Sequence, residues 1–475
     1  MSVAAASDAR LLDERVPRAL LRLALPVLAS QALRLAYQWV DALWVKGLGV
    51  EATAAVTTSV FVLWCVYSLN DIFGVGLSAY VSQLIGAGER GRAGVAVGKA
   101  AAASFGMGLV LAAAGTVAAR PLFSAMDPAG AVAEQGATYL RIVLLGAPFV
   151  MTALTAETAI RAAGDTRTPL LMDALSITLN IVLAPVLIYG WGPVPRMGIA
   201  GAALATVCAQ VVLLGCYVTL ALRRHPALPL GIHAPGPPVR IVGLARVGVP
   251  AALIGVLFSA VYLAFVRAAS PFGAAAVAIV GVANRIEALQ FMLSVSLGLA
   301  GASLLGQALG AGRIERAEAV LRTAQRWATA IASVLTVVLF SFPGLFLSMF
   351  SRDAGLLAIG VPYLRVLAVT LIATGLEIAT AESLLGSGHT REMSAIYTVV
   401  SLARIPLAFA VTRWWNAGVM GIAWLITITC VVRAVLLVGW ARLGSWKRGL
   451  ARELHGETGA PDPGETGAPD PGAAG

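Results

Sequence analysis

The sequence predicts an all-α integral membrane protein, with twelve transmembrane helices arranged as two six-helix repeats around a central cavity. The first observation is composition: of 475 residues, 59% are hydrophobic and 12% are charged. Such a composition fits one polytopic bundle and needs no soluble domain. The second is that apolar runs recur at close to the roughly 20 residues that cross a bilayer. The third is that the two halves of the chain repeat one another.

We expect the spans in the first half near 20–45, 54–77, 93–118, 135–159, 169–190 and 198–222. Those in the second half are expected near 245–268, 274–300, 317–342, 358–384, 393–414 and 418–440. The domains are therefore a cytoplasmic N-terminal segment (1–19), an N-lobe (20–222), a cytoplasmic linker (223–244), a C-lobe (245–442) and a disordered cytoplasmic tail (443–475). The linker is rich in proline, which interrupts helices. The tail repeats GETGAPDP, a composition too poor in apolar residues to order itself.

The repeat has one constant offset, which is the separation of Pro250 from Pro26 and is called the repeat offset. The same offset relates Gln83 to Gln307, the GAG triplet at 86–88 to that at 310–312, and the YLR triplet at 139–141 to that at 363–365. Duplicated bundles of this kind hold their binding site between the repeats, near the middle of the membrane, and work by rocking one repeat against the other. Because each copy has an even number of spans, the symmetry axis should run along the membrane normal.

The distribution of charge predicts the orientation. Most Lys and Arg residues outside the spans lie in the even-numbered connections and at the two ends, so the positive-inside rule places both termini in the cytoplasm. We therefore expect a multi-pass protein of the bacterial cell (inner) membrane, without a cleavable signal peptide. The four cysteines lie in apolar runs and the four histidines lack ligand spacing. Neither a metal site nor a cofactor is expected.

Seven acids lie within or at the edges of spans: Asp41, Asp71, Glu157, Asp173, Glu287, Glu377 and Glu382. An acid near the centre of a span costs about 2.5 to 3.5 kcal/mol on insertion scales, so it usually faces a cavity or the bundle interior. Asp41 has Phe265 as its counterpart in the second half. A residue that only builds the frame would more often occur in both copies, so Asp41 is the main functional candidate.

The other acids divide into two groups. Glu157 and Glu382 occupy nearly equivalent places beside Arg161 and Arg391, which favours a structural role, and Asp71 and Asp173 are also expected to be structural. Glu287 and Glu377 are acids of the second half only. Both could attract a cationic substrate or ion. For Glu287 the alternative is a neutralising pair with Arg285 or another intramembrane arginine.

Further polar residues could line the cavity. Asn180, which maps onto Arg404, is either part of a site or hydrogen-bonding glue between helices. Tyr37, Tyr139 and Asn70 are candidates for substrate contact, although aromatic side chains at such places also serve packing. No DxxD or HExxH cluster occurs, so we do not expect an enzyme.

Several stretches together resemble one family. They are YQWVDALWVKGLG around Asp41, VSQLIGAGERGRA with its echo LGQALGAGRIERA, RAAGDTRTPLLMDALSITLN, and GIAGAALAT. The whole bundle resembles the multidrug and toxic compound extrusion (MATE) transporters, in particular the DinF-like branch. The resemblance implies export of amphipathic, often cationic, drugs or toxins in exchange for protons or sodium. It implies contact with membrane lipid but not with nucleic acid, and we expect a monomer.

The resemblance also implies a coupling site. In this branch an Asp of the first helix and an Asn of the fifth form a cation-coupling cluster in the N-lobe, and Asp41 and Asn180 match those positions. The family commonly has an Asp before the fifth-helix proline, but here Ala184 precedes Pro185. Sodium needs several oxygen ligands whereas a proton needs one acid, so we expect proton-coupled antiport through Asp41. The glutamate that other branches carry in the seventh helix is also missing.

Two alternatives within transport remain open. One is a sodium-coupled drug antiporter. The other is a flippase for a lipid-linked precursor, whose cavity would need basic residues to meet a pyrophosphate. Five arginines of the spans keep that alternative open, namely Arg34, Arg141, Arg285, Arg365 and Arg404.

Overall fold

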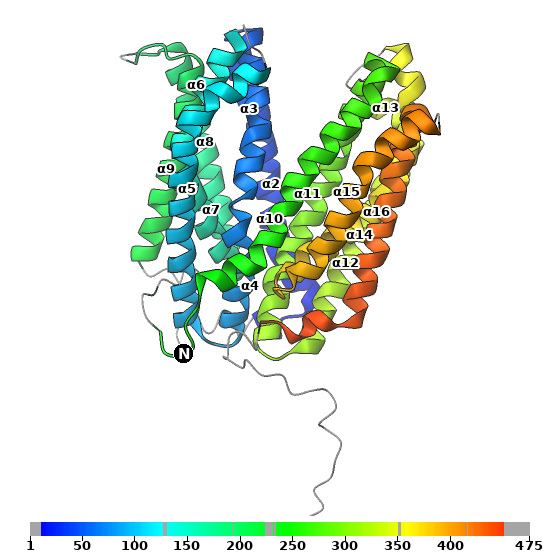
Figure 1. The fold of residues 1–475 in the computed structure, drawn as a ribbon. Coiled ribbons are helices and arrows are strands. Elements are labelled where there is room, and N and C mark those ends of the chain that lie inside the picture. The colour runs from blue at the N-terminus through cyan, green and yellow to red at the C-terminus, as the bar shows by residue number, and fades with distance from the viewer. Residues whose placement is uncertain are drawn as a thin grey trace, which may run out of the picture.

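The structure is a computed structural model and describes residues 11–126, 131–192, 194–223, 231, 234–349, 353–415 and 417–450. This part of the chain is helical, as predicted (Figure 1). The first half contains α2 (Val16–Lys46), α3 (Val50–Ser68), α4 (Asp71–Gly86), α5 (Arg90–Met126), α6 (Ala131–Leu145), α7 (Ala147–Ala162), α8 (Arg167–Tyr189) and α9 (Ile199–Leu222).

The second half begins with α10 (Ile241–Ala269), η1 (Ser270–Phe272), α11 (Ala274–Gly310), α12 (Ile314–Ser341) and α13 (Pro343–Ser348). It continues with α14 (Ala354–Leu385), α15 (Thr390–Phe409), the π-helical turn η2 (Ala410–Trp414), α16 (Gly418–Leu443) and η3 (Ser445–Arg448). The long helices correspond to the spans expected from the apolar runs.

Within the described residues, eleven helices are long and apolar enough to cross a membrane, and a twelfth span is formed if α6 and α7 count as one. These two helices meet at an angle of 52°. Pro148 lies in the first turn of α7. Because proline lacks a backbone N–H and clashes with the preceding turn, it favours a helix start here over a continuous helix. The twelve-helix prediction is confirmed with one span broken.

The sequence repeat is also a structural repeat. Three pairs of glycines related by the repeat offset have positive φ angles in both halves: Gly49 and Gly273 (107° and 92°), Gly88 and Gly312 (80° and 70°), and Gly164 and Gly388 (91° and 80°). Glycine adopts this region without the steric penalty that other residues carry. The same turns therefore connect the same helices in both lobes.

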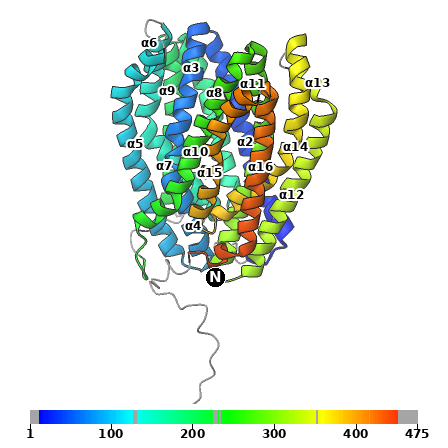
Figure 2. The ribbon, with the colours of Figure 1, turned by 45° about the vertical axis from the view of Figure 1, so that its right-hand side comes forward.

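The helices of the two halves diverge toward one end of the molecule and converge toward the other (Figure 1). The end near α6 and α13, where they diverge, is called the open end. The end near η3 and the start of α2 is called the closed end. Figure 2, turned by 45°, shows the long helices running from one end to the other.

Four apolar clusters fill the bundle and show how the lobes join. At the open end, each lobe has a cluster made of its own residues. At the closed end, Leu244 and Val247 of α10 pack into the N-lobe cluster, while Leu20 and Leu23 of α2 pack into the C-lobe cluster. The closed end is thus held together by apolar side chains of each lobe that pack into the cluster of the other lobe.

The chain ends differ from the sequence predictions. The tail was expected to be disordered from residue 443, but η3 follows α16, and two apolar side chains after α16 are buried: Trp446 within η3 (1% exposed) and Leu450 (5% exposed). Burial of these side chains explains why the segment packs. The rest of the predicted tail, 451–475, lies outside the described residues. In the linker, α10 already begins at Ile241, and 224–230 and 232–233 also lie outside the described part.

Candidate functional site

Asp41 lies on α2, five residues before that helix ends. Its Oδ1 atom is buried and has no hydrogen-bond partner, and Asp41 forms no ion pair within the described part of the chain. The phenol groups of Tyr37 and Tyr139 are close enough to interact with its charge. Buried polar atoms in proteins are nearly always hydrogen-bonded, so an unpaired carboxylate oxygen needs an explanation. A site that takes up a proton or a cation provides one.

A hydrogen-bonded group next to Asp41 joins three helices through Thr206 of α9. The Thr206 hydroxyl donates to the Ala202 carbonyl (3.2 Å), so its oxygen is left to accept. It accepts from Asn180 Nδ2 of α8 (3.2 Å) and pairs with the Tyr37 hydroxyl of α2 (3.4 Å). Asn180 therefore reaches the Asp41 helix through Thr206 and Tyr37. Thr206 was not singled out from the sequence, although it is the last residue of the GIAGAALAT stretch.

Ala184 stands where the family commonly has an Asp before the fifth-helix proline, and the structure shows the surroundings of this residue. Ala184 follows Asn180 by one helical turn on α8 and is fully buried in the apolar cluster of the N-lobe. The position at which the family commonly has a carboxylate is therefore filled by a methyl group in a hydrophobic setting. No group of three or more His, Cys, Asp and Glu side chains with metal-binding geometry occurs among the described residues.

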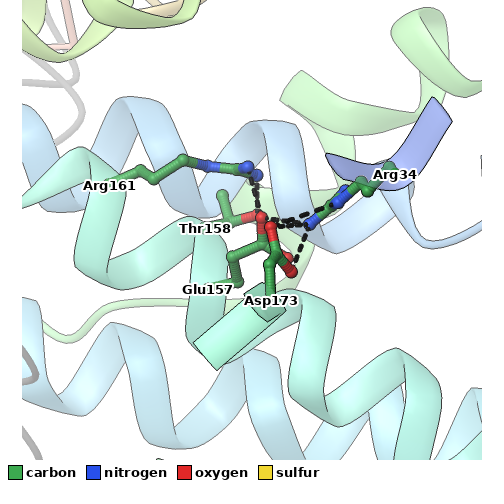
Figure 3. Close-up of polar contacts among 5 residues, drawn as sticks. All are labelled: Arg34, Glu157, Thr158, Arg161 and Asp173. Atoms are coloured by element: carbon green, nitrogen blue, oxygen red, sulfur yellow. Dashed lines mark hydrogen bonds and ion pairs between the residues drawn. The ribbon is translucent and has the colours of Figure 1, made fainter. Parts of the chain in front are cut away.

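A second group of charges lies two turns earlier on α2 (Figure 3). Arg34 Nη2 donates to Glu157 Oε1 of α7 (2.6 Å) and to Asp173 Oδ1 of α8 (3.0 Å). Arg34 Nε also donates to Asp173 Oδ2 (3.2 Å), and Arg161 binds Glu157 from the next turn of α7. Two guanidinium groups thus neutralise two carboxylates. The structure gives Glu157 and Asp173 ion pairs that tie α2 to α7 and α8.

Glu382 has different neighbours from those expected. The sequence placed it beside Arg391, as Glu157 lies beside Arg161, but its charge interacts with Asp71 and Arg161 of the other lobe. Glu157 and Glu382 differ from the exact repeat by one residue. A shift of one position in the sequence moves a side chain by about 100° around a helix with 3.6 residues per turn. The side chain of Glu382 therefore points at the lobe interface, and the role of this acid and of Asp71 stays a prediction.

The acids of the C-lobe have arginine neighbours. Glu377 of α14 pairs with Arg433 of α16 (Oε1 to Nη2, 3.1 Å), and the Arg433 guanidinium lies over the Tyr397 ring at 4.8 Å. Glu287 of α11 interacts electrostatically with Arg404 and Arg433. For Glu287 the sequence offered Arg285 or another arginine as a partner, and the neighbours come from α15 and α16. Glu377 is thus paired through one oxygen, while its Oε2 atom is buried without a hydrogen-bond partner. Glu287 lies near these arginines but forms no ion pair with them within the described residues.

The remaining candidates lie inside the bundle. Asn70 is buried and accepts a hydrogen bond from Thr155 (3.5 Å), and Tyr139 is buried in the N-lobe cluster at the open end. Arg404 donates to Thr429 (2.7 Å) and to Cys430 Sγ (3.1 Å). Contact of Asn70 and Tyr139 with substrate stays a prediction.

Comparison with known families supplies the identity. The family model described as MatE matches the chain twice, over residues 26–186 and 250–410. This chain belongs to the MatE family. The starts of the two matches, at 26 and 250, are separated by the repeat offset, so they also confirm the duplication. The resemblance to MATE transporters is confirmed, while the DinF-like branch stays a prediction.

Individual relatives cover the chain almost completely. It is 27% identical to a probable multidrug resistance protein of Bacillus subtilis, YoeA, over 89% of this chain and 92% of that protein. It is 27% identical to an FAD transporter of Shewanella oneidensis, over 90% and 94%. A solved structure described as the outward-facing conformation of a multidrug resistance MATE family transporter matches with a TM-score of 0.84 and 25% identity, over 91% of this chain and 97% of that one. The MatE protein described here is thus a multi-pass membrane transporter and not an enzyme.

Proposed function

We propose that this MatE transporter exports amphipathic, cationic compounds by proton-coupled antiport with alternating access, and that Asp41 is the coupling acid. The observation that carries the proposal is the buried Asp41 Oδ1 atom without a partner. A carboxylate in this state can neutralise one positive charge, either a proton or the cationic group of a drug. Exchange follows because the two ligands compete for one group.

The names of the relatives support efflux. Several are multidrug resistance or multidrug export proteins that align over most of this chain. One is an FAD transporter, whose named substrate is aromatic but anionic. An unpaired acid favours cations over the anionic FAD, because like charges repel in a low-dielectric site.

The cycle follows from the two charge states of Asp41. A proton from the open end makes the carboxyl group neutral, which removes its attraction for a bound cation and changes the hydrogen bonding of the neighbouring Tyr37. Tyr37 is linked through Thr206 to Asn180, so the change reaches α8 and α9. The neutral site favours the return of the empty transporter, and release of the proton on the other side restores the charge. The ligands act by binding one state better than the other.

Protons are favoured over sodium by the surroundings of Asp41. Sodium binding needs several oxygen ligands, and the fully buried Ala184 removes one carboxylate from the α8 side of the site. A proton needs one titrating oxygen. The excess of Lys and Arg supports a cytoplasmic closed end. With the protein in the bacterial inner membrane, as expected from the sequence, protons enter from the open, external end.

The flippase alternative receives less support because at least three of the five arginines that it would use have partners, although Arg141 Nε is buried without a hydrogen-bond partner. Arg34 binds Glu157 and Asp173, and Arg404 binds Thr429 and Cys430. Arg365 lies over the Phe340 ring at 5.8 Å. A pyrophosphate would have to displace the carboxylates from Arg34.

The test is efflux of a fluorescent cationic dye from proteoliposomes, driven separately by a proton gradient and by a sodium gradient. Wild type should respond to the proton gradient, and Asp41→Asn should not. Glu51→Gln is the matched control, because it removes an exposed acid at the start of α3. Sodium-driven efflux, or full proton-driven efflux by Asp41→Asn, would contradict the proposal. Transport of a flavin or a lipid-linked pyrophosphate in place of the dye would change the substrate class.

A further inference from the structure

The closed end contains two glutamines that the repeat relates to each other. Gln83 of α4 and Gln307 of α11 are separated by the repeat offset, and each is 1% exposed. Gln83 Nε2 donates to the Gly386 carbonyl at the end of α14 (2.8 Å), and Gln307 Nε2 donates to the Ala162 carbonyl at the end of α7 (3.1 Å). Gly386 and Ala162 are themselves related by the same offset. The same hydrogen bond between the lobes therefore occurs twice.

Close backbone contacts surround these hydrogen bonds. A Cβ atom added to Gly86 would lie 2.1 Å from the Gln307 carbonyl oxygen, and one added to Gly310 would lie 1.9 Å from the Gln83 carbonyl oxygen. Glycine at both places is thus what lets α4 and α11 touch. Any separation of the lobes at the closed end has to break both glutamine hydrogen bonds together with these contacts.

The C-terminal segment breaks the symmetry of the pair. The backbone N–H of Leu450 donates to Gln83 Oε1 (2.7 Å). Leu450 packs into the closed-end cluster of the N-lobe, whereas Trp446 packs into that of the C-lobe and donates from Nε1 to the Ala441 carbonyl (2.8 Å). The segment 445–450 therefore spans the lobe interface. Among the described residues, this segment forms a hydrogen bond with Gln83 but none with Gln307.

We propose that Gln83 and Gln307 are paired locks between the lobes and that the segment 445–450 is a clasp on the Gln83 lock. Its hydrogen bond to Gln83 and its contacts with both lobes exist only while the closed end is shut. A contact made in one state only shifts the equilibrium toward that state. The clasp thus holds the transporter in the conformation that is open at the other end. The inference requires that the lobes separate at the closed end, but not a particular substrate or coupling ion.

The experiment measures the distance between the lobes by double electron–electron resonance, a pulsed electron paramagnetic resonance method, on the full-length protein in lipid nanodiscs. Spin labels are placed at Leu222 of α9 and Ile314 of α12, which are exposed at the closed end (77% and 44%). The four native cysteines are replaced by serine. Leu450→Pro removes the N–H donor and leaves the Trp446 anchor in place, while Leu450→Ala keeps the donor and removes most of the side chain.

Leu450→Pro should raise the ratio of separated to closed molecules about fivefold above the ratio of Leu450→Ala, as expected for one net hydrogen bond. In a Gln83→Leu background the proline should have no larger effect than the alanine, because the acceptor of the hydrogen bond is gone. In a Gln307→Leu background it should keep its full effect. An equal effect of the proline in both backgrounds, or no difference between the proline and alanine variants, would overturn the clasp. Because the readout needs neither drug nor gradient, it is independent of the proposed coupling by Asp41.

Discussion

The two lobes share one scaffold, and each holds acids paired with arginines, but they differ at the position of Asp41. In the N-lobe, Asp41 keeps a buried carboxylate oxygen without a partner. At the equivalent place in the C-lobe, Phe265 is 2% exposed within an apolar cluster, and the acids Glu287 and Glu377 lie beside arginines. Duplication thus supplied two similar frames. We propose that the N-lobe alone carries the coupling acid, because Asp41 has no ion pair among the described residues and its counterpart is a phenylalanine.

The largest expected effect comes from breaking a compensated group. Arg34→Ala leaves Glu157 and Asp173 buried with one fewer cation, and loss of one partner of a buried ion pair typically costs about 3–5 kcal/mol. A clear fall in the thermal unfolding midpoint of the purified protein should follow. Adding Asp173→Asn, which removes one of the charges, should restore part of the loss. An Arg34→Ala protein as stable as wild type would show that this group does not hold α2.

Asp41 should behave in the opposite way. Asp41→Asn removes a charge that has no partner, so the unfolding midpoint should stay unchanged or rise, because burying an unpaired charge is itself costly. Proton-driven transport should nevertheless fall to background. A marked loss of stability in this variant would place Asp41 among the structural acids and would remove the contrast between the lobes.

A smaller effect is expected at Thr206. Thr206→Val keeps the shape of the side chain but removes the oxygen that accepts from Asn180 and faces Tyr37. Leaving a buried donor unpaired costs about 1–3 kcal/mol. Drug binding measured against pH should show a shifted midpoint, with binding at alkaline pH largely kept. An unchanged pH dependence would show that the hydrogen-bonded group does not communicate with Asp41.

The smallest expected effect comes from restoring the carboxylate that this chain lacks. Ala184→Asp places an acid one turn from Asn180 on α8, and a second carboxylate adds oxygen ligands for sodium. Sodium should then stimulate dye efflux modestly, while wild type stays insensitive. Ala184→Asn, which adds a side chain of similar size without the charge, is the control. Equal stimulation of wild type by sodium would show that Ala184 does not decide the coupling ion.

Much of this architecture could be predicted from the sequence because periodic apolar runs and a constant repeat offset are local or simple properties of the chain. The partners of the charged residues could not. Arg34 reaches acids more than a hundred positions away, and this depends on how α2 packs on α7 and α8. Glu382 shows that a shift of one residue in a helix is enough to change the neighbours of a side chain. Leu450 was assigned to a disordered tail because composition alone does not reveal a packing surface provided by distant helices.

The most direct test of the central claim is to count the protons released when a cationic drug binds. Purified transporter in weakly buffered detergent solution, near neutral pH, is mixed with drug, and a pH indicator reports the release. Wild type should release up to one proton per bound drug, whereas Asp41→Asn should bind drug more weakly and, at saturating drug, without release. Equal proton release by both proteins would contradict Asp41 as the coupling acid.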